Sequence, residues 1–347
     1  MMRFKKLTAL LLAGIMAASL AACGSGKDAS EGAESQPAGT EEQADDGKQE
    51  EYAVIMSVNQ LEFFDALKAG VCDAANELGA TWYYAGPQDL SPEKVTEAID
   101  QAVAKGVTGI VVHGQFQETG AAIDNAIEAG VPVICVNTDI ESNRLSFLGC
   151  EPYNVGVEMA KTMGELLGGE GKIIISNFLS GGQPSAIANL EGCRDELKKN
   201  WPGIEIVAEV DDKADETTAA TAVGAALQAN PDVKGIIGMQ APSAVGAATA
   251  VREAGMEGIQ IVGRDRDAAT LELIEDGEVA ASFAQNSYVE GYIAVHWLHE
   301  YINGQLKVTS DYLGAGINPL PDKVDSGSII ITKDNVEQFK EKYVYDK

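Results

Sequence analysis

Short apolar runs of about four to seven residues alternate along this chain with longer stretches in which apolar positions recur every three or four residues. Such runs are typical of strands buried on both faces of a parallel sheet, and the longer stretches are typical of the helices that cover it. We expect strands at 54–58, 81–85, 109–113, 132–136 and 146–149, then at 172–178, 204–210, 235–239 and 260–262, and helices at 62–78, 91–105, 118–129, 153–167, 185–199, 216–229, 243–254, 269–276 and 287–302, before a β-rich end.

The alternation restarts near residue 152, which predicts two α/β units in tandem. The expected fold class is α/β, with two doubly wound parallel-sheet lobes. In such sheets ligands bind beyond the carboxyl ends of the strands. The candidate ligand contacts are therefore the polar residues that follow the apolar runs: Asn59, His113, Asn137, Asn177, Gln240, Asp265 and Gln285. We expect His113 to be a loop or core histidine rather than a contact.

The N-terminal segment differs from the rest of the chain. Residues 1–22 begin with basic residues, continue through a short apolar segment and end in small residues before Cys23. This order is typical of a secretory signal peptide, and the apolar segment is short for a membrane span. Leu20-Ala21-Ala22-Cys23 resembles the bacterial lipoprotein box, which implies that Cys23 becomes a lipidated N-terminus. An ordinary signal peptide with an incidental cysteine is the alternative.

Residues 23–51 predict a flexible tether, because they are rich in Gly, Ser, Ala, Glu, Asp and Gln and have almost no apolar bulk. With a lipidated Cys23, the tether would hold the protein outside the cytoplasm, anchored to the cell membrane by its N-terminus. The 25 Lys and Arg residues face 53 Asp and Glu residues, a net charge of −28. Such a charge disfavours nucleic acid and anionic lipid surfaces as partners.

Motifs for catalysis or metal binding are missing from the sequence. It has no GxSxG elbow, no Walker A loop, no HExxH and only three histidines, so we expect no enzyme activity, no cofactor and no metal site. Besides Cys23 there are four cysteines, none in a CxxC pair: Cys72, Cys135, Cys150 and Cys193. Secretion permits disulfides among them, but we favour four buried thiols.

Several segments of the chain resemble, in order and spacing, the type I periplasmic sugar-binding proteins of ABC importers, the group that includes the ribose binders. The resemblance covers about residues 52–305. It rests on the segments Ser57–Phe64, Gly130–Val133, Asn230–Val233, Val262–Asp265 and Asp276–Ala281, the last of which leads into Ala284–Asn286.

The resemblance implies two hinged lobes that enclose a ligand, with the chain crossing between them three times. We expect crossings near 151–154, 285–287 and 312–316. The first lobe would comprise residues 52–152 and 286–313, and the second lobe residues 153–285 and 314–347.

The resemblance also implies particular ligand contacts. Asp265 matches the family aspartate that accepts two sugar hydroxyls, and a carboxylate suits this because it accepts charge-assisted hydrogen bonds. Gln285 matches the family glutamine at a crossing, and Phe63 and Phe64 match an aromatic pair that faces the sugar ring. The expected ligand contacts are Phe63, Phe64, Asn137, Thr138, Asp139, Asn189, Gln240, Asp265 and Gln285.

Other positions depart from the ribose binders: Leu61 stands in place of Asn, Asn137 and Thr138 in place of Asp and Arg, Asn189 in place of Arg, Gln240 in place of Asn, and Ala214 in place of an aromatic residue. These departures disfavour ribose itself but keep a neutral, hydrogen-bonding pocket. We expect Arg264 and Arg266 to pair with nearby acids; contact with an anionic group on a sugar acid is the alternative.

Capture of a small polar ligand, a monosaccharide or related polyol, is the function that the resemblance implies. The expected partners are an ABC permease and its ATPase, and the protein itself is expected to be a monomer. Two alternatives stay open: a sensing module that reports to a membrane receptor or histidine kinase, and a binder of a nucleoside or signalling molecule.

Overall fold

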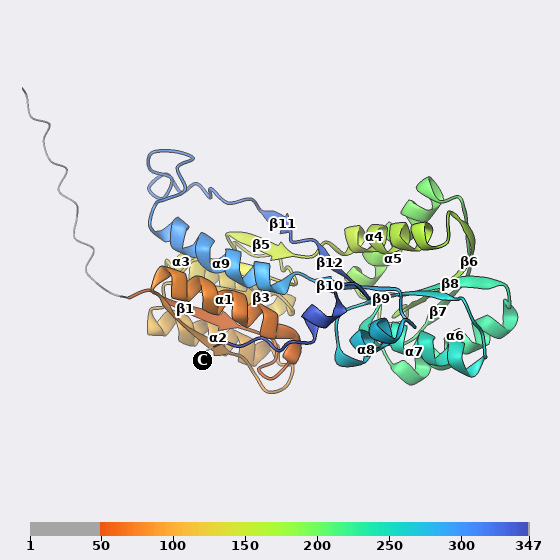
Figure 1. The fold of residues 1–347 in the computed structure, drawn as a ribbon. Coiled ribbons are helices and arrows are strands. Elements are labelled where there is room, and N and C mark those ends of the chain that lie inside the picture. Colours follow the sequence, from red (N-terminus) through yellow and green to blue (C-terminus); the bar gives the residue numbers. More distant parts are fainter. Residues whose placement is uncertain (1–48, 346–347) are drawn as a thin grey trace, which may run out of the picture. The chain divides into compact units, whose positions relative to one another are not determined.

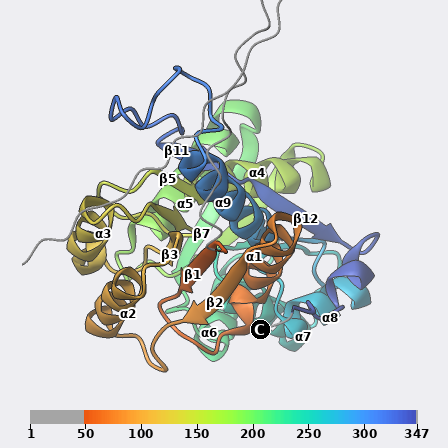
Figure 2. The same ribbon diagram turned by 90° about the vertical axis from the view of Figure 1, so that its left-hand side faces the viewer.

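The computed structural model describes residues 49–345, which form two six-stranded sheets, each covered by helices (Figures 1 and 2). The expected signal peptide, Cys23 and nearly all of the expected tether lie outside the described residues. The fold class expected from the apolar runs is confirmed. None of the helices in the described part of the chain is long and apolar enough to cross a membrane.

The first lobe is built on a sheet whose strands all run parallel, in the order β11-β5-β4-β3-β1-β2 when labelled as follows. These strands are β1 (Glu51–Ile55), β2 (Thr81–Ala85), β3 (Gly109–His113), β4 (Val133–Val136), β5 (Ser146–Gly149) and β11 (Lys323–Asp325). Its helices are η1 (Glu62–Phe64), α1 (Asp65–Leu78), α2 (Pro92–Lys105), η2 (Gln117–Thr119), α3 (Gly120–Glu128) and α9 (Ser287–Ile302).

The second lobe repeats this strand order as β7-β6-β8-β9-β10, and adds β12 antiparallel to β10. Its strands are β6 (Glu170–Asn177), β7 (Gly203–Asp211), β8 (Val233–Gly238), β9 (Gln260–Arg264), β10 (Ala281–Gln285) and β12 (Ser328–Thr332). Its helices are α4 (Pro152–Leu166), α5 (Pro184–Asn200), α6 (Glu216–Ala229), α7 (Ala241–Glu253), α8 (Ala268–Asp276) and η3 (Val336–Phe339).

Each sheet is buried on both faces, which is why its strands read as uninterrupted apolar runs. In β1, Val54 packs toward α1 and α9 on one face, and Ala53 and Ile55 pack toward α2 and α3 on the other. Figure 2 shows these two helix pairs on either side of the first sheet. Burying each bulky aliphatic side chain stabilises the fold by about 1.5–3 kcal/mol.

Glycines let one helix pair in each lobe approach closely. A methyl group at Gly70 of α1 would collide with the carbonyl of Tyr288 in α9, and one at Gly291 of α9 with the carbonyl of Leu67. The second lobe has the same close helix packing, because Gly156 of α4 lies against the carbonyl of Asn189 in α5. The two halves of the molecule thus share strand order and helix packing.

The third crossing lies later in the chain than we expected. β11 pairs with β5 in the first sheet, and β12 pairs with β10 in the second. The chain therefore passes between the sheets at Ser326–Gly327 and not near 312–316, so residues 314–325 do not belong with the second lobe. The sequence pattern at 323–332 did not reveal this crossing. Two strands of different sheets follow each other there with only two residues between them, so the segment resembles one β-rich end.

The ordered first lobe also begins slightly earlier than the expected tether end at residue 51. β1 starts at Glu51, and Glu50 is already held in place. Its carboxylate accepts hydrogen bonds from the Tyr52 hydroxyl at 2.6 Å and from Asn303 Nδ2 at 2.8 Å, and it lies 2.8 Å from His299 Nδ1. The composition around Glu50 predicts a flexible tether, but these three side chains hold Glu50 in the first lobe.

Candidate functional site

A cavity of about 620 Å³ lies among residues from the first lobe, the second lobe and the C-terminal segment. Phe63 and Asp65 line it from the first lobe, Asp265 and Gln285 line it from the second, and residues 339–343 complete its wall. Asp265 and Gln285 directly follow or end parallel strands, so they reach the carboxyl edge of the sheet, where ligands of such folds bind. The strand pattern predicted that ligand contacts would lie at this edge.

Asp265 is the residue whose geometry best suits ligand binding. It adopts the left-handed backbone conformation, with φ of 66°, and its N–H donates to the Phe283 carbonyl of β10 at 3.0 Å. Its Oδ1 atom is buried and has no hydrogen-bond partner among the described residues. Burial raises the pKa of the carboxyl, Arg264 opposes this shift and Asp267 adds to it. A buried oxygen without a partner is costly, so a ligand hydroxyl would relieve it.

Gln285 connects the cavity to the first lobe. Asn137, which directly follows β4, donates from Nδ2 to Gln285 Oε1 at 2.6 Å. Asn137 has the same left-handed φ of 66°, and its N–H donates to the Leu148 carbonyl at 2.9 Å. The structure thus brings two expected contacts together, and the amide group of Gln285 keeps its Nε2 donors for another partner.

The two phenylalanines have different surroundings. Phe63 is 37% exposed and lines the cavity, whereas Phe64 is buried. The Phe64 ring meets His113 edge-on at 5.0 Å between centroids, and His113 Nδ1 lies 2.9 Å from the Ser57 hydroxyl. Burial lowers the pKa of His113 to about 4, so this ring is a neutral core group. Of these two phenylalanines, Phe63 is the one that lines the cavity.

Thr138 and Asp139 follow Asn137 but have different surroundings. The hydroxyl of Thr138 is exposed and lies 3.3 Å from His113 Nε2. Asp139 binds Arg144 Nε at 2.5 Å and Lys323 Nζ at 2.7 Å. Burial alone would raise the pKa of Asp139, but these hydrogen bonds outweigh it and hold the pKa below its usual value. The Asp139 carboxylate is therefore already occupied by cations of the first lobe.

Gln240 and Asn189 belong to the second lobe and do not line this cavity. Gln240 caps the N-terminus of α7, exchanges backbone and side-chain hydrogen bonds with Ser243, and donates from Nε2 to Asn177 Oδ1 at 3.0 Å. Asn189 is 1% exposed, and neither of its side-chain polar atoms has a partner among the described residues. It lies where α5 packs against Gly156 of α4, away from the cavity that Asp265 lines.

Two further parts of the cavity wall are Arg266, which the sequence left open as a contact for an anionic group, and the C-terminal residues, which the sequence did not predict. Arg266 lines the cavity, and its guanidinium lies over the Tyr343 ring at 4.8 Å to the centroid rather than beside an acid. Within the described range, neither Arg264 nor Arg266 forms an ion pair. Residues 339–343 also line the wall. The aromatic pair in the C-terminal Lys342-Tyr343-Val344-Tyr345 was a signal, but nothing local indicates what it contacts.

Two further observations concern the metal-ligating side chains and the cysteines of residues 49–345. No group of three or more His, Cys, Asp or Glu side chains in this range could hold a metal ion. The four cysteines are buried thiols, and burial raises the pKa of Cys135, Cys150 and Cys193 to about 12.

Comparison with known proteins places this architecture in a family. The sequence model of one protein family, described as periplasmic binding protein domain, matches residues 52–306 of this chain. The ribose import binding protein RbsB of Bacillus subtilis strain 168 is 24% identical over 263 residues, which is 75% of this chain and 84% of that protein.

Solved structures agree with this match. The sugar-binding protein of a sugar ABC transporter from Bacillus halodurans is 29% identical, superposes with a TM-score of 0.79, and is matched over 84% of this chain and 100% of its own. AraP, an arabinose binding protein from Geobacillus stearothermophilus, is 26% identical with a TM-score of 0.77, over 85% of this chain and 100% of its own. These relatives are solute-binding proteins and not enzymes. The chain therefore belongs to the periplasmic binding protein family, as a type I sugar-binding protein of the kind that serves ABC importers.

Proposed function

We propose that this protein captures a neutral monosaccharide or a related polyol outside the cytoplasm and delivers it to an ABC permease and its ATPase. The observation that carries this proposal is the cavity of about 620 Å³ lined by Asp265, Gln285 and the half-exposed Phe63. The Oδ1 atom of Asp265 is buried and has no hydrogen-bond partner among the described residues. A sugar ring offers hydroxyls at its edge and an apolar face, and it would satisfy these three groups at once. The ribose and arabinose binders among the relatives support a sugar ligand.

Individual residues would have distinct roles. Asp265 would accept hydrogen bonds from two ligand hydroxyls, Gln285 would donate from its free amide group, and Asn137 would hold Gln285 in orientation through the 2.6 Å hydrogen bond. Phe63 would pack against the apolar face of the ring. Four expected contacts stay candidates in a different conformation of the lobes: Thr138, Asp139, Asn189 and Gln240. Before Asp139 could bind a ligand, its ion pairs with Arg144 and Lys323 would have to break.

The mechanism would be closure of the two lobes about their three crossings. Ser326 is well placed to coordinate these crossings, because its N–H donates to Gly149 at 2.9 Å and its carbonyl accepts from Asn286 at 3.4 Å. Each of the three residues lies at a different crossing. Ligand contacts from both lobes would stabilise the closed state, so binding would shift the population toward it.

A thermal-shift screen tests the ligand class. Monosaccharides, inositols, nucleosides and amino acids are each added to the purified protein without its signal peptide. We expect a sugar or polyol to raise the melting temperature, because a ligand that binds only the folded state stabilises it. Small-angle scattering with that compound should show the particle contract. A shift with an amino acid or nucleoside, and none with any sugar or polyol, would overturn the proposed ligand class.

We also propose that the protein is a lipoprotein, with residues 1–22 removed as a signal peptide and Cys23 lipidated. The family supports a location outside the cytoplasm. Support for the anchor comes from the small residues before Cys23 and from the polar stretch that follows it, which would separate the lobes from the membrane. The protein would act as a monomer that visits the permease.

A further inference from the structure

The C-terminal segment of residues 340–345, here named the C-terminal strap, leaves the second lobe after η3. Val336 of η3 is buried in the core of the second lobe. Lys340 Nζ then binds Glu275 Oε2 of α8 at 2.5 Å. Tyr343 lies under the Arg266 guanidinium, and the two are also joined by a hydrogen bond of 3.3 Å to the phenolic oxygen. Lys340 and Tyr343 thus hold the strap against the second lobe.

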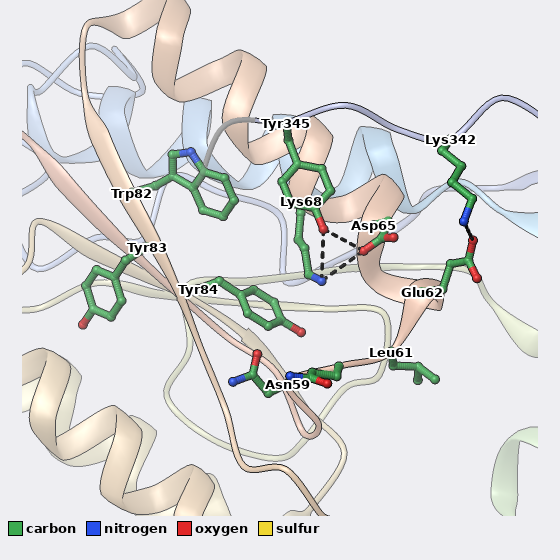
Figure 3. A pocket seen from close by; sticks show the side chains of 11 residues that line it. Asn59, Leu61, Glu62, Asp65, Lys68, Trp82, Tyr83, Tyr84, Lys342 and Tyr345 are labelled. Carbon is green, nitrogen blue, oxygen red and sulfur yellow. Dashed lines mark hydrogen bonds and ion pairs between the residues drawn. The ribbon is translucent and has the colours of Figure 1, made fainter.

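Tyr343 and Tyr345 of the strap also contact the first lobe. The Tyr343 ring stacks against Tyr288 of α9, with 6.4 Å between centroids. Two residues later, the Tyr345 hydroxyl donates to Asp65 Oδ1 of α1 at 2.8 Å. Figure 3 shows Tyr345 beside Trp82 of β2, and their ring centroids are 6.3 Å apart. One stretch of six residues therefore contacts both lobes, in addition to the three crossings.

The place where Tyr345 binds is a socket built from Asp65, Lys68, Trp82 and Tyr84. Lys68 is only 7% exposed, and a buried ammonium is costly unless it has partners. Its Nζ atom lies 3.0 Å from Asp65 Oδ1, 3.4 Å from the Tyr345 hydroxyl and 4.3 Å from the centre of the Tyr84 ring (Figure 3). Tyr345 supplies an oxygen to this cation and covers it, so the socket is incomplete without the strap.

The strap also forms part of the ligand cavity. Residues 340–343 line the cavity that contains Asp265 and Gln285. A second cavity of about 630 Å³ adjoins the socket and shares Leu61, Glu62, Asp65 and Lys342 with the first. Movement of the strap would therefore open one wall of the site and release one contact between the lobes at the same time.

We propose that the C-terminal strap determines ligand retention: docked in the Asp65–Lys68–Trp82–Tyr84 socket, it restrains the two lobes and closes one wall of the ligand cavity. The retention half of this proposal rests on the proposed sugar-binding function. The restraint on the lobes does not, and it can be measured without any ligand. Tyr345 is a positioning residue in this scheme, because it acts through the socket and does not touch the cavity that Asp265 lines.

The variants are a chain ending at Glu341, Tyr345→Ala and Tyr345→Phe, with Val344→Ala as the matched control. Val344 lies in the same strap but is 90% exposed, so its loss should leave docking unchanged. Tyr345→Phe keeps the ring against Trp82 and removes only the hydroxyl that binds Asp65 and Lys68. Thermal melts of every variant check that the lobes remain folded.

The separation of the two lobes is measured as the distance between spin labels at Glu97→Cys on α2 of the first lobe and Lys199→Cys on α5 of the second. Both positions are exposed. We expect the distance distribution to broaden in the truncated chain and in Tyr345→Ala, to change less in Tyr345→Phe, and to stay as in wild type for Val344→Ala. Identical distributions in all variants would overturn the restraint.

Stopped-flow dissociation of D-ribose or L-arabinose, whichever raises the melting temperature of wild type, tests retention. We expect release to be about tenfold faster in the truncated chain and in Tyr345→Ala, and unchanged in Val344→Ala. Release at the wild-type rate, or slower, would overturn the retention role. If neither sugar binds wild type, the sugar-binding proposal loses its support for these two sugars, while the distance measurement still decides whether the strap restrains the lobes.

Discussion

Asn137 and Asp265 occupy equivalent positions in the two lobes. Each directly follows the fourth strand of its parallel sheet, each has φ of 66°, and each donates its N–H to a carbonyl of the next strand, Leu148 or Phe283. Residues other than glycine rarely adopt this conformation, and Asn and Asp adopt it most readily. Such conformations concentrate at functional sites, and here they place one amide and one carboxylate at the carboxyl edges of the two sheets.

Asp265→Ala should weaken sugar binding by roughly ten- to a hundredfold. A hydrogen bond to a charged acceptor contributes about 1.5–3 kcal/mol, and 1.4 kcal/mol corresponds to about a tenfold change in affinity. Isothermal titration calorimetry measures the affinity. The control is Asp276→Ala, which removes an exposed carboxylate of α8 that does not line the cavity. An Asp265→Ala protein that binds as tightly as wild type would show that Asp265 does not contact the sugar.

The Phe63→Ala and Phe64→Ala variants should separate binding from stability. Phe64 is buried against His113, and truncating such a ring lowers the free energy of unfolding by about 3–5 kcal/mol. Phe63 is half-exposed in the cavity, so its truncation should cost little stability but weaken sugar binding by up to about tenfold. Urea unfolding and calorimetry on both variants check this; the opposite pattern would mean that Phe64 faces the ligand.

Glu290→Gln should flatten the dependence of stability on pH. Glu290 is fully buried in α9, accepts a hydrogen bond from the Ser326 hydroxyl at 2.8 Å, and has no partner at Oε2 among the described residues. Burial raises the pKa of Glu290 from 4.5 to about 7, although Ser326 and the backbone of Asn137 oppose the shift. A raised pKa in the folded state contributes stability that is complete below pH 4.5 and is lost as the pH rises through 7.

The size of this effect follows from the shift of the Glu290 pKa, because one pKa unit corresponds to about 1.4 kcal/mol. Between pH 4.5 and 8, the free energy of unfolding of wild type should fall by up to about 3 kcal/mol more than that of Glu290→Gln. Urea unfolding at several pH values measures both proteins under the same conditions. Curves that stay parallel over this range would show that the pKa of Glu290 in the folded protein is not raised above its value in the unfolded chain.

Cys23→Ser should abolish lipid attachment. Wild-type cells grown with a fatty-acid probe should incorporate the label into this protein, because the segment before Cys23 resembles a lipoprotein box. The matched control is Cys72→Ser, which changes a thiol that is buried within the first lobe. Equal labelling of wild type and Cys23→Ser would contradict the anchor, whatever the lobes bind.

Local patterns in the sequence were enough to predict most helices and strands. The helix at 91–105, for example, begins with Ser91, whose hydroxyl caps Lys94, and ends at Gly106 in the left-handed conformation. These signals act within a few residues, so they can be read without the fold. The edge at which the candidate contacts lie also followed from the sequence, because the carboxyl ends of parallel strands meet there. Asp265 and Gln285 are found at that edge as expected.

Contacts between residues far apart in the chain could not be predicted in this way. Phe63 and Phe64 are adjacent and chemically identical, and only the position of the first sheet determines that Phe64 is buried and Phe63 faces the cavity. The sequence alone suggested that the Asp139 carboxylate could bind a ligand. In the fold this carboxylate pairs with Lys323, which lies 184 positions away in the sequence.

The sequence by itself determined the two α/β units, their buried strands and the acidic, amide and aromatic side chains offered at the strand ends, because apolar periodicity and capping are local. The tertiary structure alone decided where the chain crosses for the third time and where its C-terminus docks. Tyr345 reaches Asp65 from 280 positions away. Such a contact depends on how the two sheets and their helices are arranged, and no pattern within either segment contains that arrangement.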